Sequence, residues 1–401
     1  MSTAQSTLER EKTDPAAPPA EPPRPVAPPA RGSAAFFQLV LIGAFCIFMV
    51  APGLLMLHDG TMWSAEARKA VRSHDPIRRI AQYRDYFQKS FGFRDALVRG
   101  YGLWQVMVVG VSSSDRVILG KDGWLFYSAE SEGDCMRHAH PLSSDEVAAW
   151  RQLLEARHRW LAQQGIEYLF FVAPDKHTIY PEMLPSPPAQ LGPKSHLDQL
   201  VDGMAGSEVR LLDLRPVLLA EKPAHGLYLK TDTHYNGRGA YLTYRAVMDA
   251  LRPSFPTLRP LDETRVSFPT RRVPGGDLAD FLGIPQWFTE DATLLEVSPP
   301  PAIEVLEPAD AARNQRLRSE LIVTASKEGK VDSAMFLRDS FLTTPLPLFA
   351  SHFKKASFHW QTQLDGSEVA RRKPKVVVQE LVERVLMLPP PKDVNVPYAV
   401  P

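Results

Sequence analysis

The sequence is poor in cysteine: only Cys46 and Cys135 occur among its 401 residues. Cys46 falls within an apolar run and Cys135 lies far outside it, so a disulfide between them is not expected, and neither belongs to a C-x-x-C spacing. The cysteine count therefore does not indicate the redox compartment. The chain also lacks an excess of charge, because 46 basic residues balance 46 acidic ones. This balance gives no electrostatic reason to expect a nucleic-acid partner.

One long apolar run stands out, "FFQLVLIGAFCIFMVAPGLLML" at residues 36–57, with 22 residues and no charge. As a helix it is long enough to span the hydrocarbon core of a bilayer. A cleaved signal peptide would begin near residue 1 and have a shorter apolar region. We therefore predict an uncleaved transmembrane anchor. The alternative, a buried helix of a soluble protein, fits less well because the run has no polar face.

The segment before this run, residues 1–35, is rich in proline and alanine, with eight prolines between Pro15 and Pro29. It predicts a disordered or polyproline-like tether. Arg24 and Arg31 precede the apolar run, and the positive-inside rule then places the tail in the cytoplasm and residues 58–401 outside. A basic cluster at residues 68–72 argues in the opposite direction.

Residues 58–114 predict a helical, membrane-proximal arm. Its apolar residues recur at helical spacing and form one stripe beside basic residues: Ile77, Ile80, Tyr83, Phe87 and Phe91. Such a helix could lie near lipid headgroups. The alternative is an arm that packs on the main domain.

From residue 115 to 390, strand and helix signals alternate. Ser143 and Glu146 form a capping-box pattern at the start of a long amphipathic helix. Four continuous apolar runs are typical of strands covered on both faces: "EYLFFVAP", "EVRLLDL", "SAMFLRD" and "PKVVVQEL". The alternation predicts a three-layer α/β domain with a mainly parallel sheet. Within it, residues 253–331 are rich in proline and less periodic, and we predict an irregular insertion there. Residues 391–401 form a short tail.

Ligands of α/β sheets bind beyond the carboxyl ends of the strands, and Ser340 is the first candidate found there. It follows the apolar strand "SAMFLRD", so its hydroxyl would point into the crevice at the strand end. Its backbone N–H could help to hold a developing oxyanion. The alternative is a serine that only caps the following helix.

A second candidate is the pair Asp232 and His234. A serine hydroxyl needs a base to act as a nucleophile at neutral pH, and histidine oriented by a carboxylate is the natural one. Two residues apart in an extended segment, both side chains leave the same face of the backbone. We therefore expect Asp232 to bond one ring nitrogen of His234 while the other faces Ser340. Taken alone, His234 could equally be a packed or capping histidine.

These residues carry a family resemblance. "RDSF" resembles the Gly-Asp-Ser-Phe block of the SGNH hydrolase superfamily, and "TDTHYN" resembles the Asp-x-His block of its alginate O-acetyltransferase branch (AlgJ/AlgX-like). In that branch the Asp-x-His block precedes the serine, as it does here. Further similar stretches occur in the same order over residues 75–388: "FGFRDAL", "VILGKDGWLFY", "FVAPDKHTIYPEMLP", "GGDLADFLGIP" and "KPKVVVQELVERVL".

The resemblance implies an SGNH-like domain that moves acetyl groups onto hydroxyls of a secreted polysaccharide. Ser340 would be the nucleophile, His234 the base and Asp232 the group that orients it, with no cofactor and no metal. A membrane-bound acyltransferase would supply the acetyl group, and other exopolysaccharide biosynthesis and export proteins would be partners. The resemblance and the predicted orientation together place the protein in the cell inner membrane, with its catalytic domain in the periplasm.

The sequence departs from the family pattern at two positions. Arg338 replaces the usual glycine before Asp339, which could alter the turn or add a charge at the mouth of the site. Tyr235 stands where tryptophan is common. Four residues near the motifs are candidates for contacting the oxyanion or the substrate: Asp339, Arg338, Asn236 and Lys176. Asn236 equally suits a helix N-cap, and Lys176 could serve only in a structural loop.

Other residues carry weaker signals. "DCMRHAH" offers the metal-capable side chains of Asp134, Cys135, His138 and His140, but their spacing matches no recognised ligand set, and a solvated loop is the preferred interpretation. The alternating aromatic residues Trp124, Phe126 and Tyr127 fit a strand core better than a sugar-stacking surface.

Two other functions remain open on the sequence. A carbohydrate or acyl esterase would use the same three residues, with water in place of the sugar hydroxyl. A non-catalytic scaffold of a polysaccharide export complex would merely resemble such an enzyme.

Overall fold

The computed structural model describes residues 31–58, 60, 64, 75–128, 132–186, 188–307 and 320–398. The chain divides into two compact units, Met1–Asp95 and Ala96–Pro401. Residues 1–30 of the predicted proline-rich tether lie outside the described residues.

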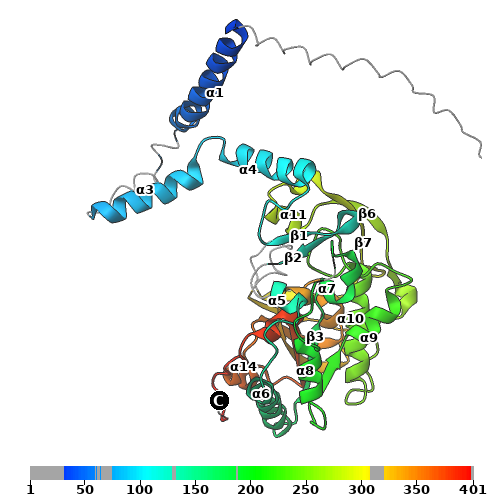
Figure 1. Ribbon diagram of the computed structural model, residues 1–401. Helices are drawn as coiled ribbons and strands as arrows, with labels where there is room; N and C mark the ends of the chain where they lie inside the picture. The colour runs from blue at the N-terminus through cyan, green and yellow to red at the C-terminus, as the bar shows by residue number, and fades with distance from the viewer. Residues whose placement is uncertain are drawn as a thin grey trace, which may run out of the picture. The chain divides into compact units, whose positions relative to one another are not determined.

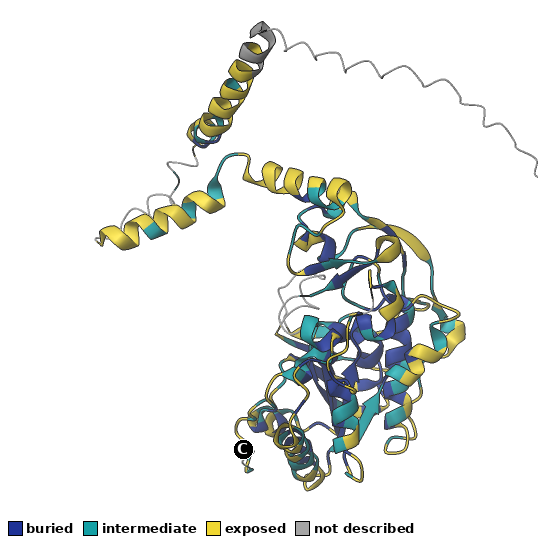
Figure 2. Ribbon diagram, viewed as in Figure 1, coloured by how far each residue is buried: buried dark blue, intermediate teal, exposed yellow. Residues whose placement is uncertain are grey.

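The first unit contains two long helices, α1 (Arg31–His58) and α3 (Pro76–Ser90). Within α1, the segment Gln38–His58 has a mean hydropathy of 2.5 and is long and apolar enough to cross a membrane, which indicates membrane anchoring. The residues of this segment are mostly exposed (Figure 2). Asp75 caps α3, because its side chain accepts from the backbone N–H of Ile77 at 2.9 Å.

The second unit is built on a seven-stranded sheet, of which Figure 1 labels strand β3. The strand order across the sheet is β4 (Arg210–Asp213), β3 (Glu167–Ala173), β13 (Val376–Val382), β11 (Val331–Arg338), β12 (Phe353–Trp360), β10 (Leu321–Ala325) and β9 (Glu304–Glu307). The first five strands are parallel to one another, while β10 is antiparallel to both β12 and β9. All four apolar runs of the sequence lie in parallel strands.

Helices cover both faces of this sheet. Successive residues of a strand point to opposite faces, and in β3 Phe170 packs into one hydrophobic cluster while Phe171 packs into the other. One face is covered by α9 (Arg215–Glu221), α10 (Gly237–Leu251) and α13 (Leu346–Ala350), and the other by α6 (Ser144–Ala162), α8 (His196–Gly203) and α14 (Gly366–Arg372). Figure 1 shows α9 and α10 on one side of β3, with α6 and α14 on the other. The predicted three-layer α/β fold with a mainly parallel sheet is confirmed.

The start of α6 follows the predicted capping box. The Ser143 side chain accepts from the backbone N–H of Glu146, and the Glu146 carboxylate accepts from the backbone N–H of Ser143 at 2.9 Å. Two of the amide groups that a helix start leaves unpaired are thereby satisfied. The start of α6 could be predicted from the sequence because its capping interactions join residues only three positions apart.

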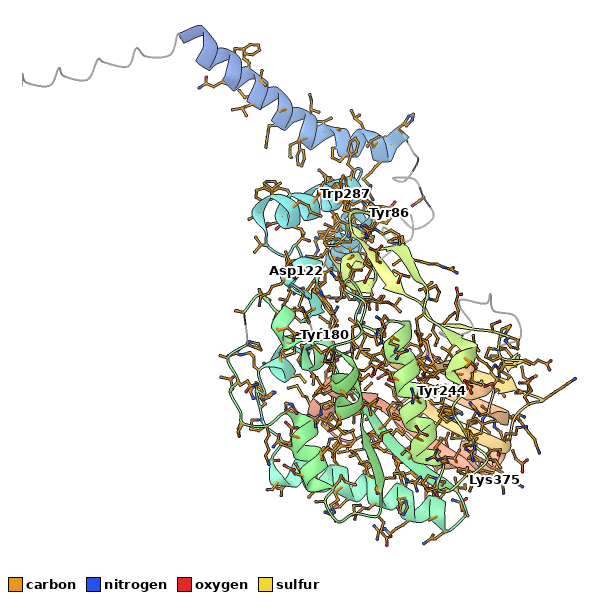
Figure 3. The ribbon with its side chains drawn as sticks, turned by 90° about the vertical axis from the view of Figure 1, so that its right-hand side faces the viewer. Tyr86, Asp122, Tyr180, Tyr244, Trp287 and Lys375 are labelled. Atoms are coloured by element: carbon orange, nitrogen blue, oxygen red, sulfur yellow. The ribbon has the colours of Figure 1, made fainter. Side chains whose placement is uncertain are left out.

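A smaller lobe extends the second unit. It contains the hairpins β1 (Val117–Leu119)–β2 (Leu125–Tyr127) and β6 (Thr270–Pro274)–β7 (Thr289–Thr293), the short pair β5 (Val266–Ser267)–β8 (Glu296–Val297) and the helix α11 (Asp277–Phe281). The helix α4 (Arg94–Leu103) belongs to this unit from Ala96 on. Residues of β1, β2 and α11 form its hydrophobic cluster. Figure 3 shows Asp122 and Trp287 of this lobe far from Lys375, which precedes the amino end of β13. The second unit also contains two short helices, α5 (Glu132–Met136) and α7 (Lys176–Ile179).

The predicted irregular insertion at 253–331 is only partly irregular. It contains β9 and β10, which belong to the main sheet, as well as α11. The sequence also gave no clear signal for β12, because Lys354 and Lys355 interrupt its apolar residues. The apolar pattern of β10 is short and that of β12 is interrupted. β10 pairs with β12 and β9, and β12 pairs with β10 and β11, so pairing within the sheet stabilises both strands.

Candidate active site

Ser340 lies immediately beyond the carboxyl end of β11, at the start of a 3₁₀ helix (Ser340–Leu342). Asp339 caps this helix by accepting from the backbone N–H of Phe341 at 2.8 Å. The other carboxylate oxygen of Asp339 accepts from the backbone N–H of Val382 at 2.9 Å, which fixes the turn to the neighbouring strand β13. The capping function considered for Ser340 therefore belongs to Asp339, and the Ser340 hydroxyl makes no hydrogen bond to the residues that the structure describes.

Asp232 and His234 lie in the segment that leads into α10. Nδ1 of His234 lies 2.7 Å from Oδ1 of Asp232, and the same oxygen accepts from the backbone N–H of His234 at 3.0 Å. The 2.7 Å bond requires the proton on Nδ1, so the neutral ring has its lone pair on Nε2. That is the tautomer a general base needs.

The pair perturbs both pKa values. Burial alone would raise the pKa of Asp232, but the hydrogen bond and charge of His234 prevail and lower it to about 2. Burial would lower the pKa of His234, but the bond and charge of Asp232, with the charges of Asp277 and Asp339, raise it above its usual value. Asp232 is thus ionised at neutral pH, and it favours the protonated form of His234.

A second carboxylate, Asp277 at the start of α11, supports the same segment. It accepts from the backbone N–H of Thr233 at 2.8 Å and from the Thr233 hydroxyl at 2.6 Å, and its Oδ2 lies 3.7 Å from Nδ1 of His234. In return, the backbone N–H of Asp277 donates to Oδ2 of Asp232 at 3.1 Å. Burial and the charge of Asp232 raise the pKa of Asp277. Its motif "GGDLADF" was visible in the sequence, but its proximity to His234 was not.

Gly276 makes this close approach possible. A Cβ atom at position 276 would lie 2.5 Å from Cβ and Oδ2 of Asp232. No side chain fits at that distance, so only glycine lets the α11 backbone reach the carboxylate.

All three predicted residues, Ser340, His234 and Asp232, border one cavity of about 350 Å³. The cavity is also lined by Leu229, Tyr235, Asp277, Thr343, Thr344 and Trp360. The ring of His234 packs 5.0 Å from the ring of Phe341, centroid to centroid. Nε2 of His234 is buried and has no hydrogen-bond partner among the described residues, Ser340 included. The tertiary structure therefore brings the three groups to one cavity, with the basic nitrogen of the histidine unengaged.

Comparison with known proteins identifies the relatives of this domain. A family model described as "SGNH hydrolase-like domain, acetyltransferase AlgX" matches residues 117–383, which is more than half of the chain. The chain belongs to this family. A probable alginate O-acetylase AlgJ from Pseudomonas aeruginosa is 29% identical over 198 residues, 48% of this chain and 48% of that protein. The corresponding protein from Pseudomonas syringae pv. tomato is 27% identical over 200 residues, 47% of this chain and 48% of that protein.

The chain thus spans about half the length of the curated relatives it matches. Among solved structures, the O-acetyltransferase domain of Pseudomonas putida AlgJ has a TM-score of 0.43 and 20% identity, covering 68% of this chain and 92% of that one. Bacillus cereus PatB1 has a TM-score of 0.46 and 15% identity, covering 67% and 96%.

In this member of the AlgX acetyltransferase family, Lys176 is a positioning residue. Its ammonium group donates to the backbone carbonyls of Leu229, Lys230 and Asp232 at 3.1, 3.1 and 2.7 Å. The side chain is buried. Lys176 therefore ties the segment that carries Asp232 to the carboxyl end of β3, and the prediction that it contacts a sugar or an oxyanion is replaced by this structural role.

The aromatic residues Trp124 and Phe126 share in this arrangement. The Lys176 ammonium group lies 5.5 and 5.3 Å from their ring centroids, within the range of a cation–π interaction. Both rings are buried. They belong to the core, as the strand interpretation predicted, and they offer no surface for sugar stacking.

Asn236 and Asp339 are likewise committed to the backbone. Asn236 caps α10, because its side-chain oxygen accepts from the backbone N–H groups of Arg238 at 2.9 Å and Gly239 at 3.1 Å. Its amide nitrogen donates to the carbonyl of Gly226 at 2.7 Å. The Asp339 carboxylate accepts two backbone bonds and is not a donor. Neither residue is among those that line the cavity with Ser340, so neither is placed to contact an oxyanion there.

Arg338, which replaces the glycine of the family pattern, is only 1% exposed. It therefore does not add a charge at the mouth of the cavity, as the sequence suggested it could. Its guanidinium group lies 4.5 Å from the ring centroid of Trp360. Burial lowers the pKa of Arg338 to about 10, with the charges of Glu380 and Asp339 opposing the shift, and the side chain stays protonated at neutral pH.

The candidate metal ligands of "DCMRHAH" do not assemble. Cys135 and His138 line a second cavity of about 590 Å³, whereas Asp134 and His140 do not. Within the described ranges, these side chains form no group close enough to share one ion, whereas Asp232, His234 and Asp277 do. In that second group the His234 Nδ1 lone pair is not available, because Nδ1 carries the proton shared with Asp232.

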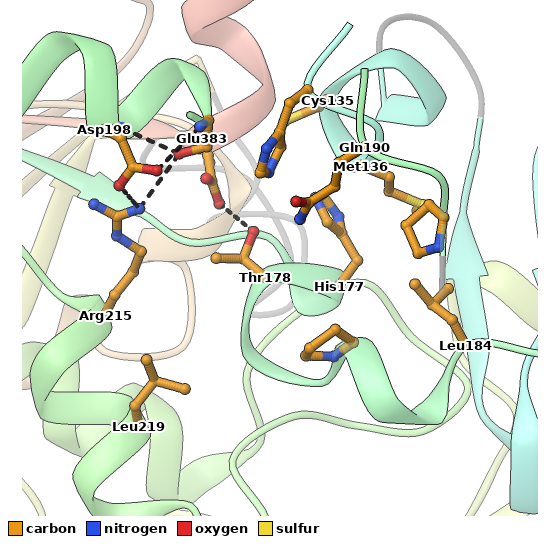
Figure 4. Close-up of a pocket in the computed structure, with 14 residues that line it drawn as sticks. Cys135, Met136, His177, Thr178, Leu184, Gln190, Asp198, Arg215, Leu219 and Glu383 are labelled. Atoms are coloured by element: carbon orange, nitrogen blue, oxygen red, sulfur yellow. Dashed lines mark hydrogen bonds and ion pairs between the residues drawn. The ribbon is translucent and has the colours of Figure 1, made fainter. Parts of the chain in front are cut away.

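The charged side chains of the second cavity are paired (Figure 4). Arg215 donates to Asp198 at 2.7 Å, and Glu383 accepts from the Thr178 hydroxyl at 2.6 Å. His177, which follows Lys176 in α7, lines this cavity and not the one with Ser340.

Proposed function

We propose that this protein is an O-acetyltransferase that acetylates hydroxyl groups of a secreted, alginate-like polysaccharide through an acetyl-serine intermediate. Family membership supports the reaction class. The observation that carries the proposal is the 2.7 Å bond between Asp232 and His234, with the opposite ring nitrogen unengaged in the cavity that Ser340 borders.

In the proposed first step, Nε2 of His234 takes the proton of the Ser340 hydroxyl as its oxygen attacks the carbonyl carbon of an acetyl donor. The bond between the acetyl group and the donor breaks, and the leaving group receives that proton from His234. In the second step, His234 takes a proton from a sugar hydroxyl, which attacks the acetyl-serine. The ester bond to Ser340 breaks, its oxygen regains a proton, and the acetylated sugar leaves. No bound cofactor is used.

Membrane attachment fits this chemistry. We propose that α1 crosses the inner membrane, with the tail in the cytoplasm and the catalytic domain in the periplasm. Because acetyl-CoA is a cytoplasmic metabolite, the acetyl group must be delivered across the membrane. A membrane-bound acyltransferase is the proposed donor partner, within an assembly of exopolysaccharide biosynthesis and export proteins.

An intact-mass experiment tests the proposed intermediate. The full chain is mixed with an activated acetyl ester, with and without alginate oligosaccharides, and quenched in acid. We expect the intact mass to rise by one acetyl group and a digest to locate that group on the peptide that contains Ser340. When oligosaccharide is present, the acetyl group should be transferred to the sugar. Release of acetate alone would favour the esterase, and no acetylation of Ser340 by any ester would contradict the proposal.

Thr343 is the proposed second oxyanion donor, alongside the backbone N–H of Ser340. Its backbone N–H donates to the carbonyl of Ser340 at 3.1 Å, which extends the 3₁₀ turn, and side chains three residues apart in such a turn eclipse each other. Arg338 donates to the Thr343 hydroxyl oxygen at 3.2 Å. Because a guanidinium group cannot accept, the hydroxyl must accept this bond, and its own hydrogen is left to donate into the cavity.

Replacing Thr343 by Val is expected to lower kcat by roughly 10²-fold, the usual effect of removing one oxyanion donor, with a small change in KM. The shape of the side chain is retained, so thermal stability should change little. Thr343→Ser, which keeps the hydroxyl, should keep most of the activity. Equal rates for the Val variant and the parent would rule Thr343 out as a donor.

A further inference from the structure

Trp360 is the last residue of β12 and lies directly opposite Arg338 in the register of β11 and β12. It borders the cavity that contains Ser340, and it is 38% exposed. The other aromatic residue of the cavity lining, Tyr235, is 2% exposed. Among the lining residues, Trp360 is therefore the one that presents a large aromatic surface to a ligand.

The indole of Trp360 is held from one side. The Arg338 guanidinium group lies 4.5 Å from the ring centroid. It is itself fixed by hydrogen bonds of 3.2 Å to the carbonyl of Asp339 and 3.2 Å to the Thr343 hydroxyl. A buried cation with such partners cannot move aside without losing these hydrogen bonds, which is costly for a buried polar group. The indole is thus oriented before any ligand arrives, which reduces the entropy lost on binding.

We propose that the cavity-facing surface of Trp360 is a stacking platform for a sugar ring of the acceptor polysaccharide. The face of an aromatic ring carries partial negative charge, and the C–H groups on one face of a pyranose carry partial positive charge. A sugar ring laid on the indole keeps its hydroxyls at its rim, where one of them can point toward Ser340. The cavity volume of about 350 Å³ is in the range of sites that hold a small molecule, well beyond the needs of an acetyl group alone.

Arg338 is a positioning residue in this proposal and does not touch the sugar. At 1% exposure it cannot reach an acidic sugar in the cavity. Recognition at this subsite therefore relies on the apolar face of the ring, a property that uronate and neutral pyranoses share. The proposal rests on the proposed function, and it adds the place where the acceptor binds.

The test measures acceptor binding without turnover, in the full chain carrying Ser340→Ala. Alginate oligosaccharides and neutral cello-oligosaccharides are titrated by calorimetry. Adding Trp360→Ala is expected to raise the Kd by about tenfold, whereas Trp360→Phe, which keeps an aromatic face, should stay within about threefold. Trp287→Ala is the matched control, because Trp287 is 57% exposed but does not border the cavity, and its Kd should equal that of the Ser340→Ala parent.

Thermal unfolding of each variant shows whether the fold is retained, and Trp360→Phe provides the comparison if Trp360→Ala is destabilised. Equal Kd values for the parent and the Trp360→Ala variant would overturn the stacking platform and leave the proposed function intact. A parent that binds neither class of oligosaccharide would overturn both proposals together. The two failures are therefore distinguishable.

Discussion

Replacing Ser340 by Ala is expected to reduce acetyl transfer to polysaccharide by roughly 10⁴–10⁶-fold, because removal of the nucleophile abolishes the acetyl-enzyme route. Ser340 is partly exposed, and its hydroxyl makes no hydrogen bond within the described part of the chain, so the fold should be unaffected. The measurement is the acetyl content of the polymer, followed by NMR spectroscopy in cells or membranes that contain the full chain.

Ser267→Ala provides the matched control for this loss. Ser267 is an exposed serine on the short strand β5, in the same unit and outside the cavity lining. The Ser267→Ala protein should acetylate polymer at the parent rate. If the Ser340→Ala protein acetylates polymer as well as Ser267→Ala does, the serine mechanism is wrong, and the scaffold interpretation gains support.

The Asp232→Asn variant is expected to lose about 10⁴-fold in kcat, although the two side chains have the same shape. Both carboxylate oxygens accept N–H bonds: Oδ1 from His234, and Oδ2 from the backbone of Asp277. An amide must place its NH₂ group against one of these donors. If it faces His234, Nδ1 becomes the acceptor, the proton moves to Nε2, and the ring cannot take the Ser340 proton.

Asp277→Asn is the matched control for Asp232→Asn. Its carboxylate accepts one bond from the backbone of Thr233 and one from the Thr233 hydroxyl. A hydroxyl can reverse its role and accept from an amide, so the local bonds survive. We expect a loss of no more than about tenfold. Equal losses for the two variants would contradict the assignment of Asp232 as the group that orients His234.

The same pair gives a pH dependence with a defined sign. A general base must be neutral, so kcat/KM should fall as the pH drops through the pKa of His234. Because Asp232, Asp277 and Asp339 raise that pKa, the acid limb should lie above the ordinary histidine value of about 6.5. Asp277→Asn removes one of these charges and should move the limb to lower pH. An unchanged limb would show that Asp277 does not act electrostatically on His234.

Features that depend on nearby residues could be predicted from the sequence. The capping box of Ser143 and Glu146 and the continuous apolar strand β3 depend on neighbours within a few residues or on uniform burial. The Asp232–His234 bond is also local, because two residues apart is close enough for the side chain to reach. Strands β10 and β12 were not predicted, because β10 is short, Lys354 and Lys355 interrupt the apolar pattern of β12, and both strands gain their stability from pairing across the sheet.

The positions of the individual groups in the cavity depended on long-range packing. Asp339, Asn236 and Lys176 are polar residues next to the motifs, so the sequence offered them as substrate contacts. In the structure each of them bonds to backbone groups. Asp339 and Asn236 cap the starts of helices, and Lys176 donates to three backbone carbonyls of the segment that carries Asp232. Conversely, the sequence did not predict that Asp277 lies beside His234 or that Trp360 borders the cavity with Ser340, since these positions depend on the packing of the smaller lobe and on the pairing of β11 with β12.

The sequence by itself determined the α/β class, the apolar segment of α1 and the residue types of a serine-based site, because periodicity, length and side-chain chemistry are properties of short segments. Tertiary structure decided which polar groups are free to react. That choice depends on hydrogen bonds between residues far apart in the chain: Arg338 with its partners behind Trp360, Lys176 with three carbonyls, and Asp277 beside His234. These contacts join residues that are distant in the sequence, so they form only when the chain folds.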